Sequence, residues 1–354
     1  MANIAVLYSA VSSDAEVLET SSSEEPPQQA DPDPLQPGHL KSRLDNAVVA
    51  RRVASALVSR GHKVTLGAVW DRVPVARLRG MHAVVNLLEH LADDSSREAE
   101  AAQQLLDAGI PFSGNAPAVL RACQRKEVCR ETLRDAGVSV PEGLTLREVP
   151  SAWPEGLPVG RVIVKPAHED ASEGIDARAV VDGLGPLREA VARVVEGMRQ
   201  PALVERYVEG RELTASLLGF PVRVLPLGEI DFSTMPAGLP HIVTYAAKWE
   251  PNSAEYACTP SVECRLDAAT TARVGKLARA TAGALGLTDV ARLDLRLDAQ
   301  GNVYVIDVNP NCDLGPDAGF AKAAARAGMS YGEMLEGVLA RALKSRAQQL
   351  SLGA

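Results

Sequence analysis

The sequence is poor in aromatic residues, and its cysteines follow no metal-binding or disulfide pattern. Phe, Trp and Tyr together make up only 4% of the 354 residues, so aliphatic side chains such as Leu, Val and Ala must fill most of the interior. The five cysteines include no CxxC pair and are odd in number, which disfavours both a disulfide framework and a zinc site. We expect reduced and mostly buried thiols.

Long apolar runs and an excess of basic charge are also missing. No apolar run approaches the ~18 residues that a membrane-spanning helix requires, and the first residues lack the basic start of a secretory signal. The formal net charge is −8, and no block of Lys and Arg stands out, which argues against a nucleic-acid partner. The sequence therefore predicts a cytoplasmic protein that binds small molecules, with neither a membrane nor a nucleic acid as partner.

The N-terminal third alternates between strand and helix patterns. Residues 3–10 and 83–88 are short apolar runs suited to buried strands, and residues 46–61 between them carry the apolar stripe of a helix. This alternation predicts an α/β domain around a doubly wound parallel sheet, which we place at residues 1–115. Residues 19–40 are rich in Pro, Ser and acidic side chains, so we predict a flexible insert there.

The remainder of the chain has the pattern of an α+β protein. An apolar strand is predicted at residues 161–167, and residues 201–219 give two strands around a Glu-Gly turn. We divide this part into a central unit at residues 116–200, a C-terminal unit at residues 201–345 and a tail at residues 346–354.

The most informative segment is RLDLRLDAQGNVYVIDVN, residues 292–309. It has the alternation of a strand hairpin closed by a four-residue AQGN loop, in which Asp298 faces Val303. That register places Asp294 opposite Asp307 and gives the other face a wholly apolar set, in which Leu295 and Leu297 meet Ile306 and Tyr304. Because directly opposed carboxylates repel, a positive group should sit between Asp294 and Asp307.

The polar face of this hairpin suits a hard divalent ion. Magnesium usually binds through one or two carboxylates plus substrate phosphates, so Asp294, Asp307 and Asn309 are candidate ligands, with Arg292 close enough to meet an anion. The alternative is a solvated charged face without a bound ion. Lys165, at the end of an apolar strand beside a Gly-containing loop, is a candidate phosphate ligand or an ordinary exposed lysine.

Four further side chains each have two interpretations. Glu205 and Glu212 could accept hydrogen bonds from an adenine amino group and ribose hydroxyls, or they could be surface acids. Cys312 follows the candidate metal strand and is a possible nucleophile in position, but a packed thiol is favoured. His168 could contact a nucleotide or substrate, or could be a plain surface histidine.

Taken as an ordered set, these segments resemble the ATP-grasp ligases, and within them the D-alanine:D-alanine ligases. The resemblance covers roughly residues 80 to 340 and is carried by these segments, in the family's order and spacing: GIPFSG, AGVSVPEG, VIVKPA, VERYVEGRELT, LPLGEI, YAAKW, ARLDLRL, DVNPN and AAARAGMSYGEMLEGVL. It implies an ATP-grasp fold behind an N-terminal pre-ATP-grasp domain. It also implies ATP and Mg²⁺ as cofactors, with two metal ions and Mn²⁺ as a substitute, and a homodimer.

The resemblance assigns roles to the positions that match the family's motifs. The catalytic residues would be Arg292, which stabilises the transferring phosphoryl group and the tetrahedral intermediate, and Lys248, which reaches the phosphates. The residues implied to bind ATP are Lys126, Lys165, Glu205, Arg206, Tyr207, Val208, Glu212 and Lys248. The residues implied to bind magnesium are Asp294, Asp307 and Asn309, with Asp307 standing where the family usually has Glu.

The chemistry that the resemblance implies is carboxylate activation. ATP phosphorylates a carboxylate to an acyl phosphate, an amine attacks, and phosphate leaves. Positioning and charge neutralisation carry such a reaction, which explains Lys, Arg and metal ligands in place of a nucleophilic side chain.

The substrate side departs from the family's pattern. Ala171 and Ser172 stand where the family has paired serines, and Trp249 replaces a tyrosine. Asp313 lies near a family glycine, and Ala318 near the serine that binds the second substrate's carboxylate. A carboxylate at Asp313 would repel an anionic substrate end and attract an amine. The candidate substrate residues are Ser172, Trp249, Asp313 and Asp317.

The sequence thus predicts an ATP-dependent carboxylate–amine ligase. It would form an amide or peptide bond from an amino acid or small peptide other than two D-alanines. Three alternatives stay open: a true D-alanine:D-alanine ligase with a diverged substrate site, a nucleotide-binding regulatory protein without ligation, and phosphoryl transfer to an acceptor other than a carboxylate.

Overall fold

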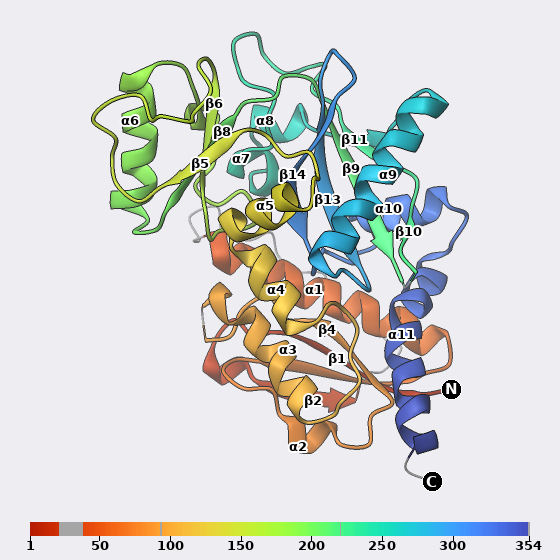
Figure 1. The fold of residues 1–354 in the computed structure, drawn as a ribbon. Helices are drawn as coiled ribbons and strands as arrows, with labels where there is room; N and C mark the ends of the chain where they lie inside the picture. Colours follow the sequence, from red (N-terminus) through yellow and green to blue (C-terminus); the bar gives the residue numbers. More distant parts are fainter. Residues whose placement is uncertain (21–37, 93, 220, 353–354) are drawn as a thin grey trace.

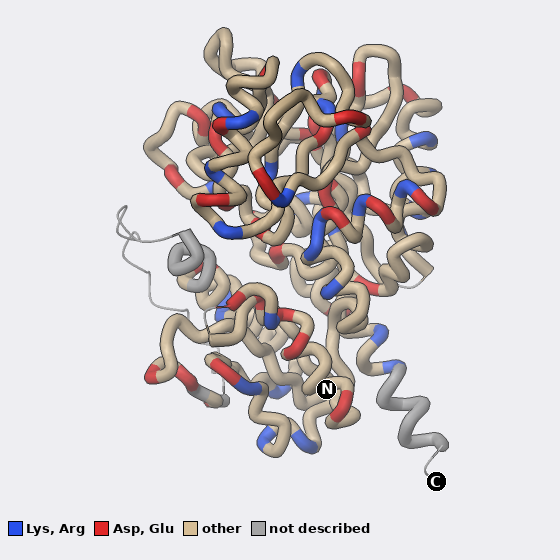
Figure 2. The backbone as a smooth tube through the Cα atoms, turned by 60° about the vertical axis from the view of Figure 1, so that its left-hand side comes forward, with Lys and Arg blue, Asp and Glu red and all other residues tan. Residues whose placement is uncertain are grey.

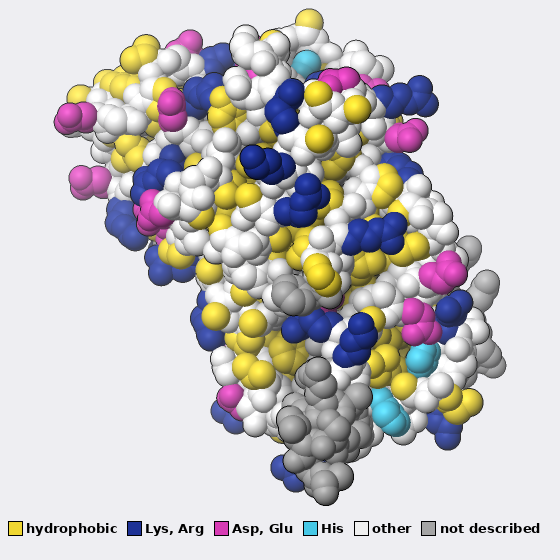
Figure 3. Space-filling model, turned by 45° about the vertical axis from the view of Figure 1, so that its right-hand side comes forward, with side chains coloured by type: hydrophobic (Ala, Val, Ile, Leu, Met, Phe, Trp, Pro, Cys, Tyr) yellow, Lys and Arg dark blue, Asp and Glu magenta, His cyan; other side chains and the backbone are white. Residues whose placement is uncertain are grey.

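The computed structural model describes residues 1–20, 38–92, 94–219 and 221–352, arranged around three β-sheets (Figure 1). The N-terminal sheet occupies the lower half of that view, and the two other sheets lie above it. On the face shown in Figure 3, basic, acidic and apolar side chains are intermixed. None of the helices in these ranges is both long and apolar enough to span a membrane.

The N-terminal sheet has the strand order β2-β3-β1-β4, formed by Val17–Thr20, Lys63–Val69, Asn3–Ser9 and Ala83–Leu87. β3, β1 and β4 pair in parallel, and β2 is an antiparallel edge strand. Alternate residues of β1 enter two separate apolar clusters, one with α1 (Gly38–Ser59) and the other with α3 (Glu98–Asp107). Helices therefore cover both faces, as predicted for a doubly wound sheet. Three short elements complete this part: η1 (Ser13–Ala15), α2 (Val75–Leu78) and η2 (Ser95–Arg97).

Both described ends of the predicted insert, residues 19–20 and 38–40, belong to regular secondary structure. Glu19 and Thr20 belong to β2, where they pair with Leu66 and Thr65 of β3, and α1 begins at Gly38. Backbone pairing with an existing strand satisfies the donors and acceptors of this acidic segment, which composition alone does not reveal. Residues 21–37 of the predicted insert lie outside the described residues.

The central sheet has the order β5-β8-β6-β7, formed by Gly143–Leu146, Ala202–Arg206, Val162–Pro166 and Val180–Val181. All of its pairings are antiparallel, and α6 (Leu184–Ala192) packs on one face. The chain reaches it through α4 (Pro117–Gln124) and α5 (Lys126–Asp135), and η3 (Ala177–Ala179) and η4 (Arg193–Gly197) complete it. Because β8 pairs with β6, the boundary that we placed after residue 200 is one strand too early.

The large sheet has the order β12-β11-β9-β13-β14, with β10 also paired to β9. Its strands are Ser261–Glu263, Gly228–Ile230, Arg211–Leu218, Ala291–Leu297, Val303–Asn309 and, for β10, Arg223–Val224. α9 (Ala268–Leu285) buries Val274 and Ala278 against Leu213 and Leu293 of this sheet. At Gly210 the chain turns into β9 with φ 141°, and a Cβ there would collide with the carbonyl oxygen of Leu297, so only glycine fits.

The last helices return to the N-terminal sheet. α7 (Tyr245–Trp249) and α8 (Ala254–Ala257) contact each other, and α10 (Gly319–Arg326) contacts both β9 of the large sheet and α11. α11 (Tyr331–Leu352) packs against α1 and β4. The predicted C-terminal unit, residues 201–345, therefore ends earlier in structural terms, and the helix continues into the predicted tail. An amphipathic helix needs an apolar face to cover, and the sequence does not say which sheet supplies it.

The β13–β14 hairpin keeps its predicted register only in the half nearest the site. Asp294 lies opposite Asp307 and Arg292 opposite Asn309, but beyond Asp294 a β-bulge shifts the pairing by one residue. Leu295 therefore faces Val305 and Leu297 faces Val303, so the predicted partners Ile306 and Tyr304 are wrong. The cause lies in the closing loop, residues 298–302, where Asp298 accepts from the backbone nitrogens of Gln300 and Asn302 and Gly301 adopts φ 82°.

Shortening one buried side chain of α11 tests how much its packing against the N-terminal sheet contributes to stability. Leu339 is fully buried in the cluster that α11 shares with the N-terminal sheet, so Leu339→Ala should lower the free energy of unfolding by about 2–5 kcal/mol. Leu106→Ala is the control, because Leu106 is 53% exposed, and it should change the free energy by about 0.5 kcal/mol or less. Urea unfolding measures both, and equal losses would contradict the docking of α11.

Candidate active site

The predicted site residues line two adjoining cavities. The first, of about 680 Å³, lies between the central and large sheets and is lined by residues from β6, β8, β9, β13, β14 and α7. The second, of about 840 Å³, lies between α1, β4 and the loop after β14. Asp170, Lys248 and Arg292 line both, so the two cavities meet at these side chains.

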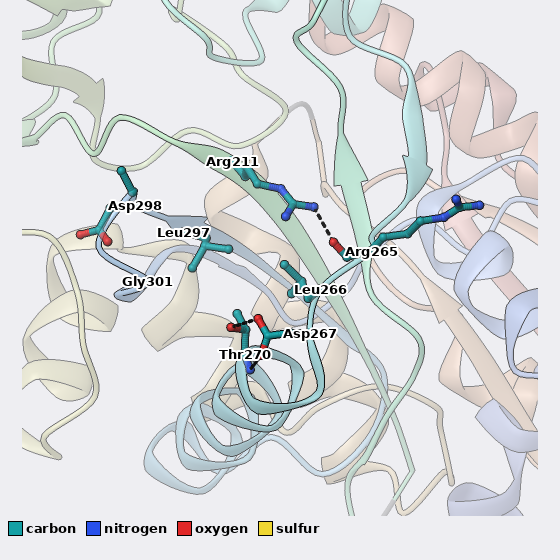
Figure 4. Close-up of a pocket in the computed structure, with 9 residues that line it drawn as sticks. Arg211, Arg265, Leu266, Asp267, Thr270, Leu297, Asp298 and Gly301 are labelled. Carbon is teal, nitrogen blue, oxygen red and sulfur yellow. Dashed lines mark hydrogen bonds between the residues drawn. The ribbon is translucent and has the colours of Figure 1, made fainter.

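A third, smaller groove of about 400 Å³ lies apart from this site, at the hairpin tip and the start of α9 (Figure 4). It contains none of the predicted site residues. Arg211 there is bound to the Glu229 carboxylate and donates to the backbone oxygen of Arg265, so its charge is already compensated. We do not count this groove as part of the site.

The polar face of the hairpin places an arginine directly against one of the two opposed carboxylates. The Nε and one terminal nitrogen of Arg292 bind the two oxygens of Asp294 at 2.8 and 2.9 Å. The charge of Asp294, together with this fork of hydrogen bonds, raises the pKa of Arg292 well above its usual value. Arg292 therefore remains a cation at the junction of the two cavities.

The second carboxylate of the hairpin is held by a lysine from the preceding unit. Lys126, the first residue of α5, places its Nζ 3.0 Å from Oδ1 of Asp307 and 2.9 Å from Oδ1 of Asp170. Burial works to raise the pKa of Asp307, but Lys126 and Lys165 outweigh it, and the pKa is lowered. The positive group expected between the opposed acids is thus supplied, in this structure, by Lys126 and Arg292.

Lys165 is a further cation that lines the first cavity. Its Nζ lies 2.9 Å from Oε2 of Glu205 and 3.3 Å from the carbonyl oxygen of Ile306, the residue at the hairpin bulge. Arg130 places its Nε 3.4 Å from Oε1 of Glu205 and so shares that carboxylate. We did not predict Arg130, although its position one helical turn after Lys126 puts both side chains on the same face of α5.

Another part of the first cavity is lined by an aromatic ring and a charged pair, Tyr207 and Glu212 with Arg296. Glu212 binds Arg296 at 3.0 Å, and burial raises the pKa of Glu212. The Arg296 guanidinium also lies over the rings of Tyr207 and Phe232, at 5.6 and 5.7 Å from their centres. Arg296 was not predicted, but the alternation that placed Arg292 and Asp294 on the polar face extends to it.

The remaining residues of the predicted adenine segment, Arg206 and Val208, also line this cavity. The Arg206 guanidinium lies over the ring of Tyr304, 4.9 Å from its centre, so it is partly held against the hairpin. Val208 is buried directly after Tyr207, where the chain leaves β8. The structure therefore brings all four residues of the segment, Glu205 to Val208, to one wall.

Lys248 and Trp249 come from α7. Lys248 lines both cavities, and Trp249 lines the second. Burial and then the charge of Arg292 lower the pKa of Lys248. Trp249 donates from Nε1 to the carbonyl oxygen of Ala171, at 2.9 Å, and its ring centre lies 5.4 Å from Nζ of Lys248. Ser172 donates to the carbonyl oxygen of Val243, so its hydroxyl hydrogen is already used. Ala171 and Ser172 both have positive φ, 56° and 62°.

Of the remaining candidates, Cys312, Asp313 and Asp317 line the second cavity. Asp313 accepts from the backbone nitrogen of Gly315 at 2.7 Å, whereas Asp317 is 89% exposed and binds Arg52 at 2.9 Å, away from the reacting groups. Cys312 is buried, and burial raises its pKa to about 12, which fits the packed thiol that we favoured. His168 contacts Glu127 at 3.2 Å and lines neither cavity.

The donor set of the hairpin fits a divalent ion that arrives with phosphate oxygens. Within the described ranges no cluster of three or more His, Cys, Asp or Glu side chains could hold a metal ion unaided. Asp294 and Asp307 are nevertheless directly opposed, and Asn309 follows two residues later on β14. Two carboxylates and an amide oxygen, completed by phosphate, match the way in which magnesium is bound in proteins.

Comparison with known proteins decides the family. A family model described as the D-ala D-ala ligase C-terminus matches residues 154–340. The chain belongs to this family. It is 32% identical over 319 residues to the uncharacterized protein y4sG of Sinorhizobium fredii, covering 87% of this chain and 89% of that protein. It is 28% identical to the D-alanine–D-alanine ligase of a Synechococcus strain, covering 88% of this chain and 93% of that enzyme.

The fold of the whole chain agrees with this assignment. The crystal structure of the D-alanine–D-alanine ligase from Bacillus anthracis complexed with ATP superimposes with a TM-score of 0.71 at 18% identity, covering 99% of this chain and 100% of that one. The predicted ATP-grasp fold is confirmed. The protein is an ATP-dependent ligase of the class that forms carbon–nitrogen bonds.

Replacing Asp307 tests the metal assignment in this ligase without any knowledge of its substrates. If Asp307 binds magnesium, Asp307→Asn should reduce by about tenfold or more the factor by which Mg²⁺ strengthens binding of a non-hydrolysable ATP analogue. Calorimetric titration with and without Mg²⁺ measures that factor. Asp298→Asn, at the tip of the same hairpin, is the matched control and should leave it unchanged. An unaltered factor in Asp307→Asn would remove the metal assignment.

Proposed function

We propose that the protein uses ATP to activate the carboxylate of an amino acid or small peptide as an acyl phosphate, and then joins it to an amine. The observation that carries this proposal is that Lys248 and Arg292 line both cavities. A carboxylate placed in the second cavity would meet two cations at the point where it adjoins the first, which is where a transferring phosphoryl group must pass.

The reaction balances with the groups at this junction. A carboxylate oxygen attacks the γ-phosphorus of ATP, and ADP leaves. The amine nitrogen then attacks the acyl carbon, the C–O bond to phosphate breaks, and the nitrogen loses a proton. Negative charge develops first on the phosphoryl oxygens and then on the tetrahedral intermediate. Arg292, which remains charged, and Lys248 supply the neutralisation.

The first cavity suits the nucleotide. We propose that adenine lies along Glu205 to Val208, that Glu212 receives the ribose, and that Lys126 and Lys165 bind phosphate oxygens. Each of these charges has a protein partner in the present structure, namely Asp307, Glu205 or Arg296. On ATP binding, Lys126 would leave Asp307 and bind a phosphate oxygen instead. Asp294, Asp307 and Asn309 would hold magnesium, which neutralises phosphate charge when bound.

We further propose that the substrates are not two D-alanines. Asp313 lines the second cavity near the position of a family glycine, and Ala318 stands near the position of the serine that binds the second substrate's carboxylate. A substrate carboxylate would therefore meet the charge of Asp313 and find no serine hydroxyl. Trp249 lies at the wall of the same cavity with its Nε1 committed to Ala171, so it reproduces no tyrosine hydroxyl.

The name of the Synechococcus relative favours a second candidate, true D-alanine:D-alanine ligation with a diverged substrate site. We also propose, from the family resemblance, a homodimer in the cytoplasm, which sedimentation and fractionation would test.

Trapping the acyl phosphate tests the proposed function without the natural amine. Hydroxylamine attacks acyl phosphates, so purified protein, ATP, Mg²⁺ and a panel of amino acids and dipeptides should give a hydroxamate with at least one of them, in step with ADP release.

The variant Arg292→Lys tests the role of Arg292 in this reaction. It keeps the positive charge but loses the two hydrogen bonds to Asp294, so it should lower hydroxamate formation by at least about tenfold. Hydroxamate from D-alanine alone would favour the second candidate. Absence of hydroxamate across the panel, in protein shown to bind the ATP analogue, would overturn the proposal.

A further inference from the structure

Under the proposed function, the second cavity is the chamber in which the reacting groups of the two substrates meet. It has a volume of about 840 Å³ and meets the first cavity at Lys248 and Arg292. Its far end is formed by α1 and by the loop that follows β14. A substrate whose reacting end lies at Arg292 therefore extends toward α1.

The described lining of this chamber contains many acidic side chains and few basic ones. Nine Asp and Glu side chains line it, whereas Lys248 and Arg292 are the only Lys or Arg among its described lining residues, and both lie at the nucleotide end. Part of the negative charge is compensated, because Asp170 binds Lys126 and Asp317 binds Arg52. Elsewhere in the molecule, Lys/Arg and Asp/Glu segments are intermixed (Figure 2). Burial raises the pKa of Glu98 to about 8, so that side chain adds little charge, but acidic side chains still outnumber Lys and Arg along the described lining of the chamber.

Two of these carboxylates are brought together by packing at the far end. Val49 of α1 lies against the loop after β14, since a Cβ at Gly315 would come within 3.1 Å of Val49 Cγ2 and 3.0 Å of Asp313 Oδ1. Asp45 is one helical turn before Val49 and so lies on the same face of α1. Asp45 and Asp313 therefore face each other across the chamber wall, and both are exposed to it.

The partner of Asp313 within the protein is a neutral donor. Its Oδ1 accepts from the backbone nitrogen of Gly315, which leaves the charge of the carboxylate in place. Burial, and after it the charge of Asp313, raises the pKa of Asp45, although Arg52 and Lys248 act in the opposite direction. A carboxylate-bearing substrate end placed here would meet like charge from two elements, whereas an ammonium group would be attracted by both.

Resting on the proposed function, we propose that the amine substrate carries a second cationic amino group, held by Asp45 and Asp313 at the far end of the chamber. The substrate class is an aliphatic diamine. One amine attacks the acyl phosphate at Arg292 and loses a proton as phosphate leaves. The other stays protonated at the far end and takes no part in the bond that forms.

Binding of matched amines tests this proposal. The full-length protein, saturated with Mg²⁺ and a non-hydrolysable ATP analogue, is titrated with the series from 1,3-diaminopropane to 1,6-diaminohexane. Each diamine is compared with the monoamine and the ω-amino acid of the same chain length. At least one diamine should bind about tenfold more tightly than both of its matched compounds, and added salt should reduce that preference.

Charge-neutral variants locate the second ammonium group. Asp313→Asn keeps an oxygen that can accept from Gly315, and Asp45→Asn changes an exposed side chain, so both variants should fold and bind the ATP analogue normally. Each should reduce the diamine preference by about fivefold, as expected for exposed ion pairs. Asp107→Asn, which removes an exposed charge outside the chamber, is the control and should leave the preference unchanged.

The proposal is overturned if no diamine in the series is preferred to its matched compounds, or if Asp107→Asn has the same effect as the two chamber variants. Its failure is distinguishable from failure of the proposed function. Hydroxamate formation without a diamine preference leaves the ligase intact and removes the diamine site. A diamine preference without hydroxamate formation leaves the diamine site and removes the proposed reaction.

Discussion

The site depends on two carboxylates, Asp294 and Asp307, that adjacent strands hold directly opposite each other. The backbone ladder of β13 and β14 fixes this opposition, so the two side chains cannot relieve their repulsion by separating. The surrounding structure compensates with cations from three directions. Arg292 comes from the same strand, Lys126 from α5 and Lys165 from the central sheet. The junction between the two ATP-grasp halves is therefore held together by charge as well as by apolar packing.

This arrangement explains why ligand binding must exchange partners. Removing one member of a buried ion pair typically costs about 3–5 kcal/mol, because the other charge is left without compensation. If the first cavity binds ATP as proposed, Lys126 can leave Asp307 for a phosphate only when another cation compensates Asp307, and the magnesium ion proposed to accompany the nucleotide would do so. Lys165 and Arg130 share Glu205 in the same way, so one of them can change partner while the carboxylate stays neutralised. Such networks hold a site ready without the ligand.

The sequence carries the site's polar pattern well and its irregularities poorly. Strict alternation placed Arg292, Asp294, Asp307 and Asn309 on one face, because the period of a strand is a backbone property. The β-bulge after Asp294 was missed, since it follows from the hydrogen bonds of Asp298 in the closing loop. That bulge brings the carbonyl of Ile306 to Lys165, a contact that no periodic pattern predicts.

Contacts between distant segments were the least predictable. The domain boundary after residue 200 was misplaced because β8 and β9 are both apolar strands, and only pairing shows that β8 completes the central sheet. Arg130 and Arg296 were missed because each is ordinary in its own segment and becomes part of the site through a carboxylate on another strand. The residues that the family resemblance assigns to ATP all line the first cavity, and their roles stay a prediction, whereas the facing carboxylates Asp45 and Asp313 are found only once α1 is seen beside the loop after β14.

The proposed reaction depends on one step, the activation of a carboxylate by phosphorylation at Arg292. Transfer of an oxygen label tests it most directly. The carboxylate oxygens of the substrate are labelled with ¹⁸O. The carboxylate oxygen that attacks ATP stays on phosphorus when the amine breaks the C–O bond, so the inorganic phosphate released during ligation should contain one ¹⁸O atom. Release of unlabelled phosphate together with the amide product would show that no acyl phosphate forms.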